Sequence, residues 1–258
     1  MNESTGHPLV EFRDVHKRFG SLVVLDGINL KIASGESIVI IGASGSGKSV
    51  LLKHIVGLLK PDEGEVWFDG QRIDTMGERQ LMEIRKQCGF LFQMGALFDS
   101  LTVGENIGFP IQEHTHKSAA EVRRIVAQRL AMVGLPGIEG KMPAELSGGQ
   151  RKRVALARAI ALEPRIILYD EPTTGLDPIR ADVINELILK LHRELHTTSV
   201  TVTHDMNSAF KVAQRIVMLH EGKLIVDAAP HEIQNIQDPI VRRFVLGEAD
   251  ERELAALQ

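Results

Sequence analysis

Two short glycine-rich segments carry residue types and spacings suited to binding phosphate. The first, Gly42 to Ser49, fits the pattern G-x-x-x-x-G-K-[ST], in which main-chain N–H groups surround a chain of phosphates. The second, Leu146 to Gln150, is a Ser-Gly-Gly turn ahead of a predicted helix, and the N-terminus of a helix also attracts anions. A function for this chain must therefore explain two phosphate-seeking motifs.

The residues of the first motif have separate chemical roles. Gly42, Gly45 and Gly47 permit backbone angles and a close approach to phosphate that a side chain would prevent. Lys48 is suited to contact the β- and γ-phosphates, and Ser49 is suited to bind Mg²⁺. We assign four further positions of this loop to nucleotide binding: Ala43, Ser44, Ser46 and Val50.

Acidic residues and a histidine follow two further apolar runs. Asp170 and Glu171 come directly after the run Ile166 to Tyr169, and a parallel strand would carry them to the ligand-binding edge of an α/β sheet. Asp170 suits a water-mediated contact to Mg²⁺, and Glu171 suits a general base for an attacking water. His204 follows the run Ser199–Thr203 and reaches the same edge, with an ordinary loop histidine as the alternative interpretation.

Strand and helix patterns alternate along the chain and predict an α/β fold. The continuous apolar runs Ser37–Ile41, Arg165–Tyr169 and Ser199–Thr203 are typical of parallel strands buried on both faces. Helical spacing is found at Lys48–Leu59, Gly77–Lys86, Ala119–Val133 and Ile179–Glu194. We predict the remaining strands at Val10–Phe12, Ile28–Ile32, Glu65–Gly70, Gly89–Gln93, Arg215–Leu219 and Lys223–Asp227.

The stretch from about Met94 to Ala155 lacks strand-like runs and predicts a helical lobe inserted into the core. We therefore expect a discontinuous nucleotide-binding core of residues 1–92 and 157–246 and a helical subdomain of residues 93–156. Residues 247–258 form a charged tail, either a short helix or a frayed end.

Composition narrows the classes of function. The 258 residues are 43% hydrophobic, enough for one large domain, and the net charge of −4 without a basic stripe disfavours a nucleic-acid partner. The single cysteine, Cys88, fits a reducing cytosol and is expected to pack as a small apolar residue. His114 and His116 are expected in a polar loop rather than at a metal. With no long apolar run and a polar N-terminus, we expect a cytoplasmic protein that is soluble by itself.

Taken together, the motifs resemble those of the ATPase subunits of ABC transporters, in the family order and over about residues 9 to 245. Lys48 and Ser49 match the Walker A motif, and Asp170 and Glu171 match Walker B. Gln93 matches the Q-loop, and Leu146–Gln150 matches the signature. Gly175–Pro178 matches the D-loop, and His204 matches the switch histidine. The resemblance implies an ABC ATPase fold, with a RecA-like P-loop core, an antiparallel β subdomain and the inserted helical lobe.

The resemblance also implies particular contacts to ATP and Mg²⁺. Gln93 joins Ser49 and Asp170 as a metal-site residue and also faces the nucleotide. Phe19 lies where the family places an aromatic that stacks on adenine; the family more commonly has Tyr there, and a core phenylalanine is the alternative. In hydrolysis Lys48 would neutralise charge, Glu171 would orient water, and His204 would hold the γ-phosphate.

A dimer would explain the second phosphate-seeking motif. In relatives, the residues at Ser147, Gly148 and Gly149 cap the γ-phosphate held by the opposite subunit. Gln150 and Asp177 are assigned to the same shared nucleotide site. Each chain would thus carry two half-sites, and an ATP-dependent homodimer would enclose two nucleotides.

The segment after Gln93 has the string Gly95 to Phe98, with Val103, Glu105 and Asn106 behind it. It resembles the ATPases of MCE-associated lipid systems, nearest to the Mla phospholipid transporter. That likeness implies phospholipid transport between the inner and outer membranes, an integral membrane permease, an MCE-domain lipid-binding protein and a STAS-domain protein. The chain would be peripheral, on the cytoplasmic face of the inner membrane. Leu97 and Phe98 would form a socket for the permease, or alternatively fill the lobe core.

Other functions remain as alternatives. The nearest is the ATPase of an importer for amino acids or other small solutes. A soluble ABC protein acting on ribosomes or DNA is disfavoured because the chain has one copy of each motif and a net negative charge. A non-hydrolysing regulatory cassette is disfavoured because Lys48, Glu171 and His204 are all present. The direction of transport is not encoded in these residues.

Overall fold

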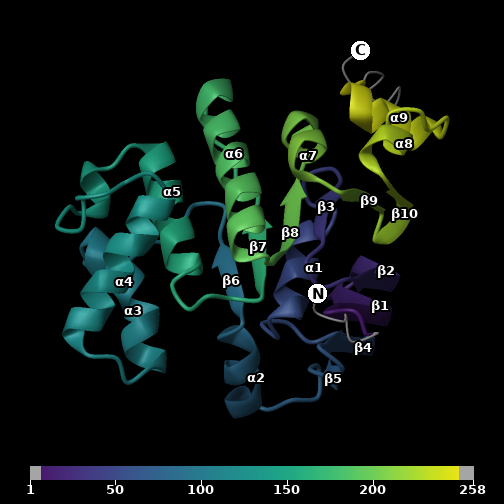
Figure 1. The fold of residues 1–258 in the computed structure, drawn as a ribbon. Helices are drawn as coiled ribbons and strands as arrows, with labels where there is room; N and C mark the ends of the chain where they lie inside the picture. The colour runs from purple at the N-terminus through teal and green to yellow at the C-terminus, as the bar shows by residue number, and fades with distance from the viewer. Residues whose placement is uncertain (1–6, 250–258) are drawn as a thin grey trace.

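The computed structural model describes residues 7–249 and consists of two sheets with helices around them (Figure 1). The smaller sheet is antiparallel, with strand order β2-β1-β4-β5. Its strands are β1 (Val10–Phe19), β2 (Leu22–Ile32), β4 (Glu63–Phe68) and β5 (Gln71–Arg72). It lies to one side of the larger sheet, as an antiparallel subdomain of the predicted kind.

The larger sheet has strand order β10-β9-β3-β8-β7-β6. All its pairs are parallel except the hairpin of β9 with β10. Its strands are β3 (Ser37–Ile41), β6 (Cys88–Leu91), β7 (Ile166–Asp170), β8 (Thr198–Thr203), β9 (Arg215–His220) and β10 (Lys223–Ala228). Because β3, β7 and β8 are neighbours and parallel, the segments that follow them meet at one edge of the sheet.

The larger sheet separates two hydrophobic cores. Every residue of β3 is buried, and its side chains alternate between the cores, with Ile38 and Ile40 on one face and Val39 and Ile41 on the other. β7 alternates in the same way. This burial on both faces explains why these strands are continuous apolar runs in the sequence.

The described residues also form nine α-helices and a 3₁₀ turn (Pro143–Glu145). The helices are α1 (Lys48–Ile55), α2 (Glu78–Arg85), α3 (Val103–His114), α4 (Ala119–Met132), α5 (Gly148–Ala159), α6 (Pro178–Leu195), α7 (Met206–Val212), α8 (Pro230–Ile233) and α9 (Pro239–Leu246). Helices α3, α4 and α5 pack on one another and lie on the opposite side of the molecule from the small sheet (Figure 1). The boundaries proposed for the helical subdomain, 93 and 156, remain a prediction.

Several predicted elements differ from those observed. Helix α1 ends at Ile55 instead of continuing to Leu59, because Gly57 takes a left-handed conformation and its N–H bonds to the carbonyl of His54. Strands β1 and β2 are longer than predicted, since shifts of register between Phe12 and Val15 break the alternation that marks a strand.

Helix α3 was not among the predicted elements, and the expectation that His114 lies in a loop was wrong, because it is the last residue of this helix. A capping box of Thr102 and Glu105 starts α3, and Val103, Ile107 and Ile111 bury one face at a helical spacing. That signal is present in the sequence and could have been used. His116 lies in the segment between α3 and α4.

The single cysteine begins β6. The Cys88 thiol donates to the carbonyl of Ile84 at 3.3 Å, and burial raises its pKa to about 12. The predicted tail lies mostly outside the described residues, and Gly247 caps the end of α9 in a left-handed conformation.

Candidate functional site

The glycine loop joins β3 to α1, as the sequence motif requires. A Cβ atom at Gly42 would lie 2.3 Å from the carbonyl oxygen of Leu219, and one at Gly47 would lie 2.8 Å from a methyl group of Val24. Gly45 has φ of +79°, so it too takes a conformation that favours glycine. Gly47 is the N-cap of α1 and provides no capping side chain, so the first N–H groups of the helix remain suited to an anion.

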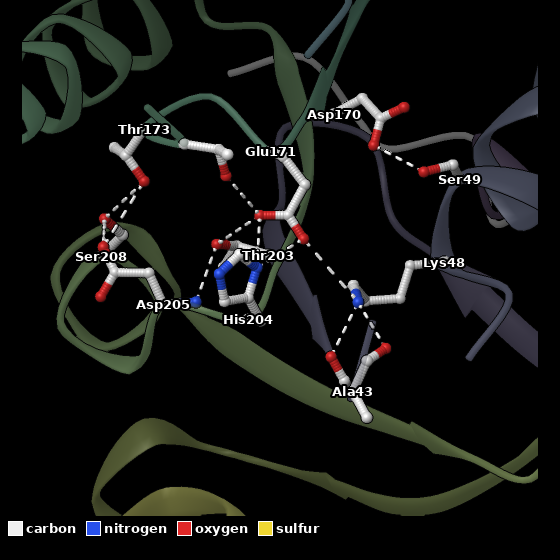
Figure 2. Close-up of polar contacts among 12 residues, drawn as sticks. Ala43, Lys48, Ser49, Asp170, Glu171, Thr173, Thr203, His204, Asp205 and Ser208 are labelled. Carbon is white, nitrogen blue, oxygen red and sulfur yellow. Dashed lines mark hydrogen bonds and ion pairs between the residues drawn. The ribbon is translucent and has the colours of Figure 1, made fainter. Parts of the chain in front are cut away.

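Lys48 crosses the loop that precedes it. Its Nζ donates to the carbonyl oxygens of Gly42 at 2.7 Å and Ala43 at 2.9 Å, and lies 3.7 Å from the Glu171 carboxylate (Figure 2). Burial lowers the pKa of Lys48, while the charges of Glu171 and Asp170 oppose that shift. The ammonium group is therefore held between the loop and the acidic end of β7.

Ser49 and Asp170 meet although 121 positions separate them in the chain. The Ser49 hydroxyl donates to the Asp170 carboxylate at 2.7 Å (Figure 2). Burial raises the pKa of Asp170, and the hydrogen bond from Ser49 opposes that shift. A hydroxyl and a single carboxylate fit Mg²⁺, which uses few protein oxygens and completes its shell with water and phosphate. Residues 7–249 contain no group of three or more His, Cys, Asp and Glu placed to hold a metal.

Glu171 lies at the centre of a polar cluster just beyond β7. Its carboxylate is 3.0 Å from Nδ1 of His204 and accepts from the hydroxyls of Thr174 at 3.1 Å and Thr203 at 3.3 Å (Figure 2). The residue is 8% exposed and has φ of +49°, a conformation uncommon outside glycine. Such geometry persists only where the surroundings hold it, and here it aims the carboxylate at Lys48 and His204.

A cavity of about 440 Å³ brings most of the predicted site residues together. Its lining comprises Phe19, Val24, Ser44, Gly45, Gly47, Lys48, Ser49, Val50, Gln93, Glu171 and His204. Its volume lies within the range usual for small-molecule sites. Phe19 is 47% exposed at the cavity, so the alternative that it is a core residue was wrong.

The signature residues and Asp177 do not line this cavity. Ser147 caps α5 by accepting from the N–H of Gln150, and Asp177 caps α6 by accepting from the N–H of Arg180. The two segments lie side by side, because a Cβ at Gly148 would be 3.8 Å from a methyl group of Leu176. One chain therefore presents its second phosphate-seeking motif beside the D-loop and outside its own cavity.

Sequence reasoning missed several residues around Glu171. The Asp205 carboxylate accepts from Ser208 at 2.6 Å and from Thr173 at 3.5 Å. Lys152, on α5, donates to the main-chain oxygen of Glu171 at 3.1 Å. The position of Asp205 next to His204 offered a signal for the first group, but no motif pointed to Lys152.

A glycine loop between a parallel strand and a helix, with a lysine, a hydroxyl–carboxylate pair and a carboxylate–histidine pair at the same sheet edge, defines a P-loop ATPase. The model of the ABC transporter family matches residues 25–174. The chain belongs to this family, and it is an ATP-binding, ATP-hydrolysing subunit.

Two relatives illustrate the family. The intermembrane phospholipid transport system ATP-binding protein MlaF of Haemophilus influenzae is 43% identical over 94% of this chain and 92% of its own length. The probable ribonucleotide transport ATP-binding protein mkl of Mycobacterium tuberculosis is 42% identical over 92% of this chain and 66% of its own.

Among solved structures, a dimeric post-hydrolysis state of the ATP-binding cassette MJ0796 bound to ADP and Pi has a TM-score of 0.79 and 38% identity, covering 86% of this chain and 98% of that one. The expected fold, with its P-loop core, antiparallel subdomain and helical lobe, is thereby confirmed. In residues 7–249, no helix has the length and apolar character needed to cross a bilayer.

Proposed function

We propose that the chain is the ATPase of a phospholipid transport system similar to Mla, peripheral on the cytoplasmic face of the inner membrane and moving lipid between the inner and outer membranes. The similarity to MlaF extends over nearly the whole of both chains, and this observation carries the proposal. The implied partners are an integral membrane permease, an MCE-domain lipid-binding protein and a STAS-domain protein.

The surface that would receive the permease follows the Q-loop. Phe98 is 45% exposed and stacks edge-on against Phe109, with 5.2 Å between ring centroids. Arg158 donates to the carbonyl oxygens of Gly95 and Ala96 and lies 5.8 Å from the centroid of the Phe98 ring. A cavity of about 330 Å³ borders these residues. This supports the interpretation of Phe98 as part of a socket rather than as a filler of the lobe core.

The chain would act as a homodimer that closes on ATP. Its signature and D-loop segments lie beside each other and do not line its own nucleotide cavity, which leaves them for the nucleotide of a second copy. The dimeric state of the relative cassette supports the same arrangement. Ser147, Gly148, Gly149 and Gln150 would then cap the γ-phosphate across the interface, with Asp177 beside them.

Within each cavity the residues would divide the work of hydrolysis. Lys48 and the loop N–H groups would bind the phosphates, Phe19 would stack on adenine, and His204 would contact the γ-phosphate. Ser49, Gln93 and Asp170 would hold Mg²⁺, which supplies charge neutralisation when bound. Glu171 would orient and deprotonate the attacking water.

The role of Glu171 is tested with Glu171→Gln, which keeps the shape of the side chain and removes its basicity. ATP binding should persist, ATP-dependent dimers should accumulate on size-exclusion chromatography, and turnover should fall by at least about a hundredfold. Full turnover in this variant would remove Glu171 from the mechanism.

The transported substrate is tested by purifying the tagged chain from native membranes in mild detergent. Recovery of a lipid-bearing complex with a permease and an MCE-domain protein supports phospholipid transport. The second candidate is a nucleotide or another small solute, favoured by the 42% identity to the probable ribonucleotide transport protein. Recovery of a permease with a soluble solute receptor and no lipid would overturn the phospholipid proposal.

A further inference from the structure

Lys152 is a buried cation that the functions proposed above do not use. It lies on α5, is 6% exposed, and its Nζ donates to the main-chain oxygen of Glu171 at 3.1 Å. Among residues 7–249, Glu171 is the only hydrogen-bond partner recorded for this ammonium group. A buried lysine that makes one specific contact, to the residue holding the central carboxylate of the site, requires an explanation.

The contact falls on the strained part of the backbone at the end of β7. Glu171 has φ of +49°, and its N–H donates to the carbonyl of Val202 at 3.0 Å. Its carbonyl oxygen accepts from Lys152 and from the N–H of Thr174 at 3.3 Å. The main-chain N–H and the carbonyl oxygen of Glu171 are therefore both held by hydrogen bonds, and the direction of its carboxylate follows from the main-chain conformation.

The charges around Lys152 favour an ammonium group that is held in one orientation. Burial lowers its pKa to about 8, while the carboxylates of Glu171 and Asp170 oppose that shift. Burying an ammonium group is costly unless nearby acceptors and charges offset the loss of water. If this position were needed only for packing, an apolar side chain would fill it without the cost of burying a charge.

Helix α5 carries both the signature segment and Lys152. The helix begins at Gly148, next to the D-loop residue Leu176, and Lys152 follows four residues later, about 6 Å along the axis. A displacement of the helix start therefore displaces the Lys152 stem as well, because a single short helix moves as one body.

We propose that Lys152 is a positioning residue. By donating to the carbonyl oxygen of Glu171 it fixes the backbone of that residue, and it thereby links the signature helix α5 to the Glu171 carboxylate of the same chain. When the signature segment of one chain closes on the nucleotide held by the second copy, the Glu171 carboxylate of the first chain would therefore shift as well. This inference rests on the proposed role of Glu171 as the general base.

The test replaces Lys152 by Met, Gln and Arg in the full chain and measures kcat, KM for ATP, nucleotide affinity and Tm. We expect Lys152→Met to lower kcat by about tenfold to a hundredfold, with nucleotide affinity within about twofold of wild type. Lys152→Arg should recover most of kcat because it keeps a cationic donor. Lys152→Gln, which keeps a donor without charge, gives a second folded variant if the methionine variant aggregates.

Lys190→Met is the matched control. Lys190 also donates to a main-chain oxygen, that of Met132, at 3.0 Å, but it connects α6 to the end of α4 rather than to the end of β7. Its replacement should change Tm and leave kcat within about twofold. If kcat of Lys152→Met stays at the wild-type value, whatever its Tm, Lys152 does not position Glu171 and the proposal is wrong.

A double-mutant cycle separates this inference from the role of Glu171. In the Glu171→Gln background, Lys152→Met should cause no further loss of the residual turnover, since both changes act through one carboxylate. Additive losses would overturn the positioning role. If Glu171→Gln alone is fully active, the assignment of the general base fails instead, and a loss in Lys152→Met would then have to arise elsewhere.

Discussion

Nδ1 of His204 lies 3.0 Å from the Glu171 carboxylate, although 33 positions separate the two residues. The contact exists because β7 and β8 are adjacent parallel strands, so that the residues after each strand meet at one edge. Glu171 is buried and fixed by several partners, whereas the His204 side chain is 49% exposed. The pair therefore joins a rigid carboxylate to a histidine with room to move toward a ligand.

Removing this histidine should affect turnover more than folding. We expect His204→Ala to lower kcat by about tenfold to a hundredfold, because Glu171 loses its imidazole partner and the γ-phosphate loses a contact. The free energy of unfolding should change by no more than about 0.5 kcal/mol, since the side chain is half-exposed. Steady-state ATPase assays and urea unfolding check both parts. His231→Ala, at an exposed position of α8, is the control, and equal activity in the two variants would contradict the prediction.

Lys48 should be needed for nucleotide affinity. Lys48→Met removes the ammonium group that lies between the loop carbonyls and Glu171, so the affinity for ATP should weaken at least about tenfold. Lys53→Met, on the exposed face of the same helix, should bind like the wild type. Titration with a fluorescent ATP analogue measures both. Unchanged affinity in Lys48→Met would show that the loop N–H groups alone bind the phosphates.

The two glycines at the start and middle of the loop should fail in different ways. Gly42→Ala should lower the free energy of unfolding by about 1–3 kcal/mol, because its Cβ would overlap the main-chain oxygen of Leu219. At Gly45, which lines the cavity, nothing lies within 4 Å of the added Cβ, so only the strain of its φ of +79° opposes a side chain. Gly45→Ala should therefore lose nucleotide affinity with the smaller loss of stability. Urea unfolding and ATP titration of both variants decide, and a larger loss of stability at Gly45 would refute the steric argument.

The parallel core was accessible from the sequence because its strands are buried on both faces and so appear as uninterrupted apolar runs. Ser37–Ile41 was predicted to the residue, since a glycine loop bounds it on one side and turn residues on the other. Helix α3 escaped prediction because Gly104, Gly108 and Pro110 obscure its apolar spacing. Burial on one face, together with the capping box of Thr102 and Glu105, overrides those weak intrinsic propensities.

For the site, motif spacing indicated which residues would gather, and most of them line one cavity. It did not reveal the contacts that orient them. The left-handed backbone of Glu171 and the hydrogen bond from Lys152 depend on how α5 packs against the end of β7, which no local pattern encodes. The sequence motifs thus predict the reactive groups but not the residues that position them.

The buried ammonium group of Lys152 should make stability depend on pH in a defined direction. Its pKa is lowered by burial to about 8 in the folded chain, against an ordinary value of about 10.4 in the unfolded chain. Between these two pH values the unfolded chain binds a proton that the folded chain does not, so the contribution of Lys152 to the free energy of unfolding rises with pH. Below about pH 8 both states are protonated and the cost of burying the charge is constant.

Lys152→Met removes this group and leaves the other titrations in place. The free energy of unfolding of the wild type, relative to that of the variant, should therefore increase as pH rises from about 8 toward about 10. Urea unfolding at several pH values across this window measures the difference, and Lys190→Met serves as the comparison. A difference that stays constant with pH would mean that the Lys152 ammonium group is not desolvated in the folded chain. A rising difference would show that the chain keeps a destabilising charge beside Glu171, the exchange of stability for activity that is expected at a catalytic centre.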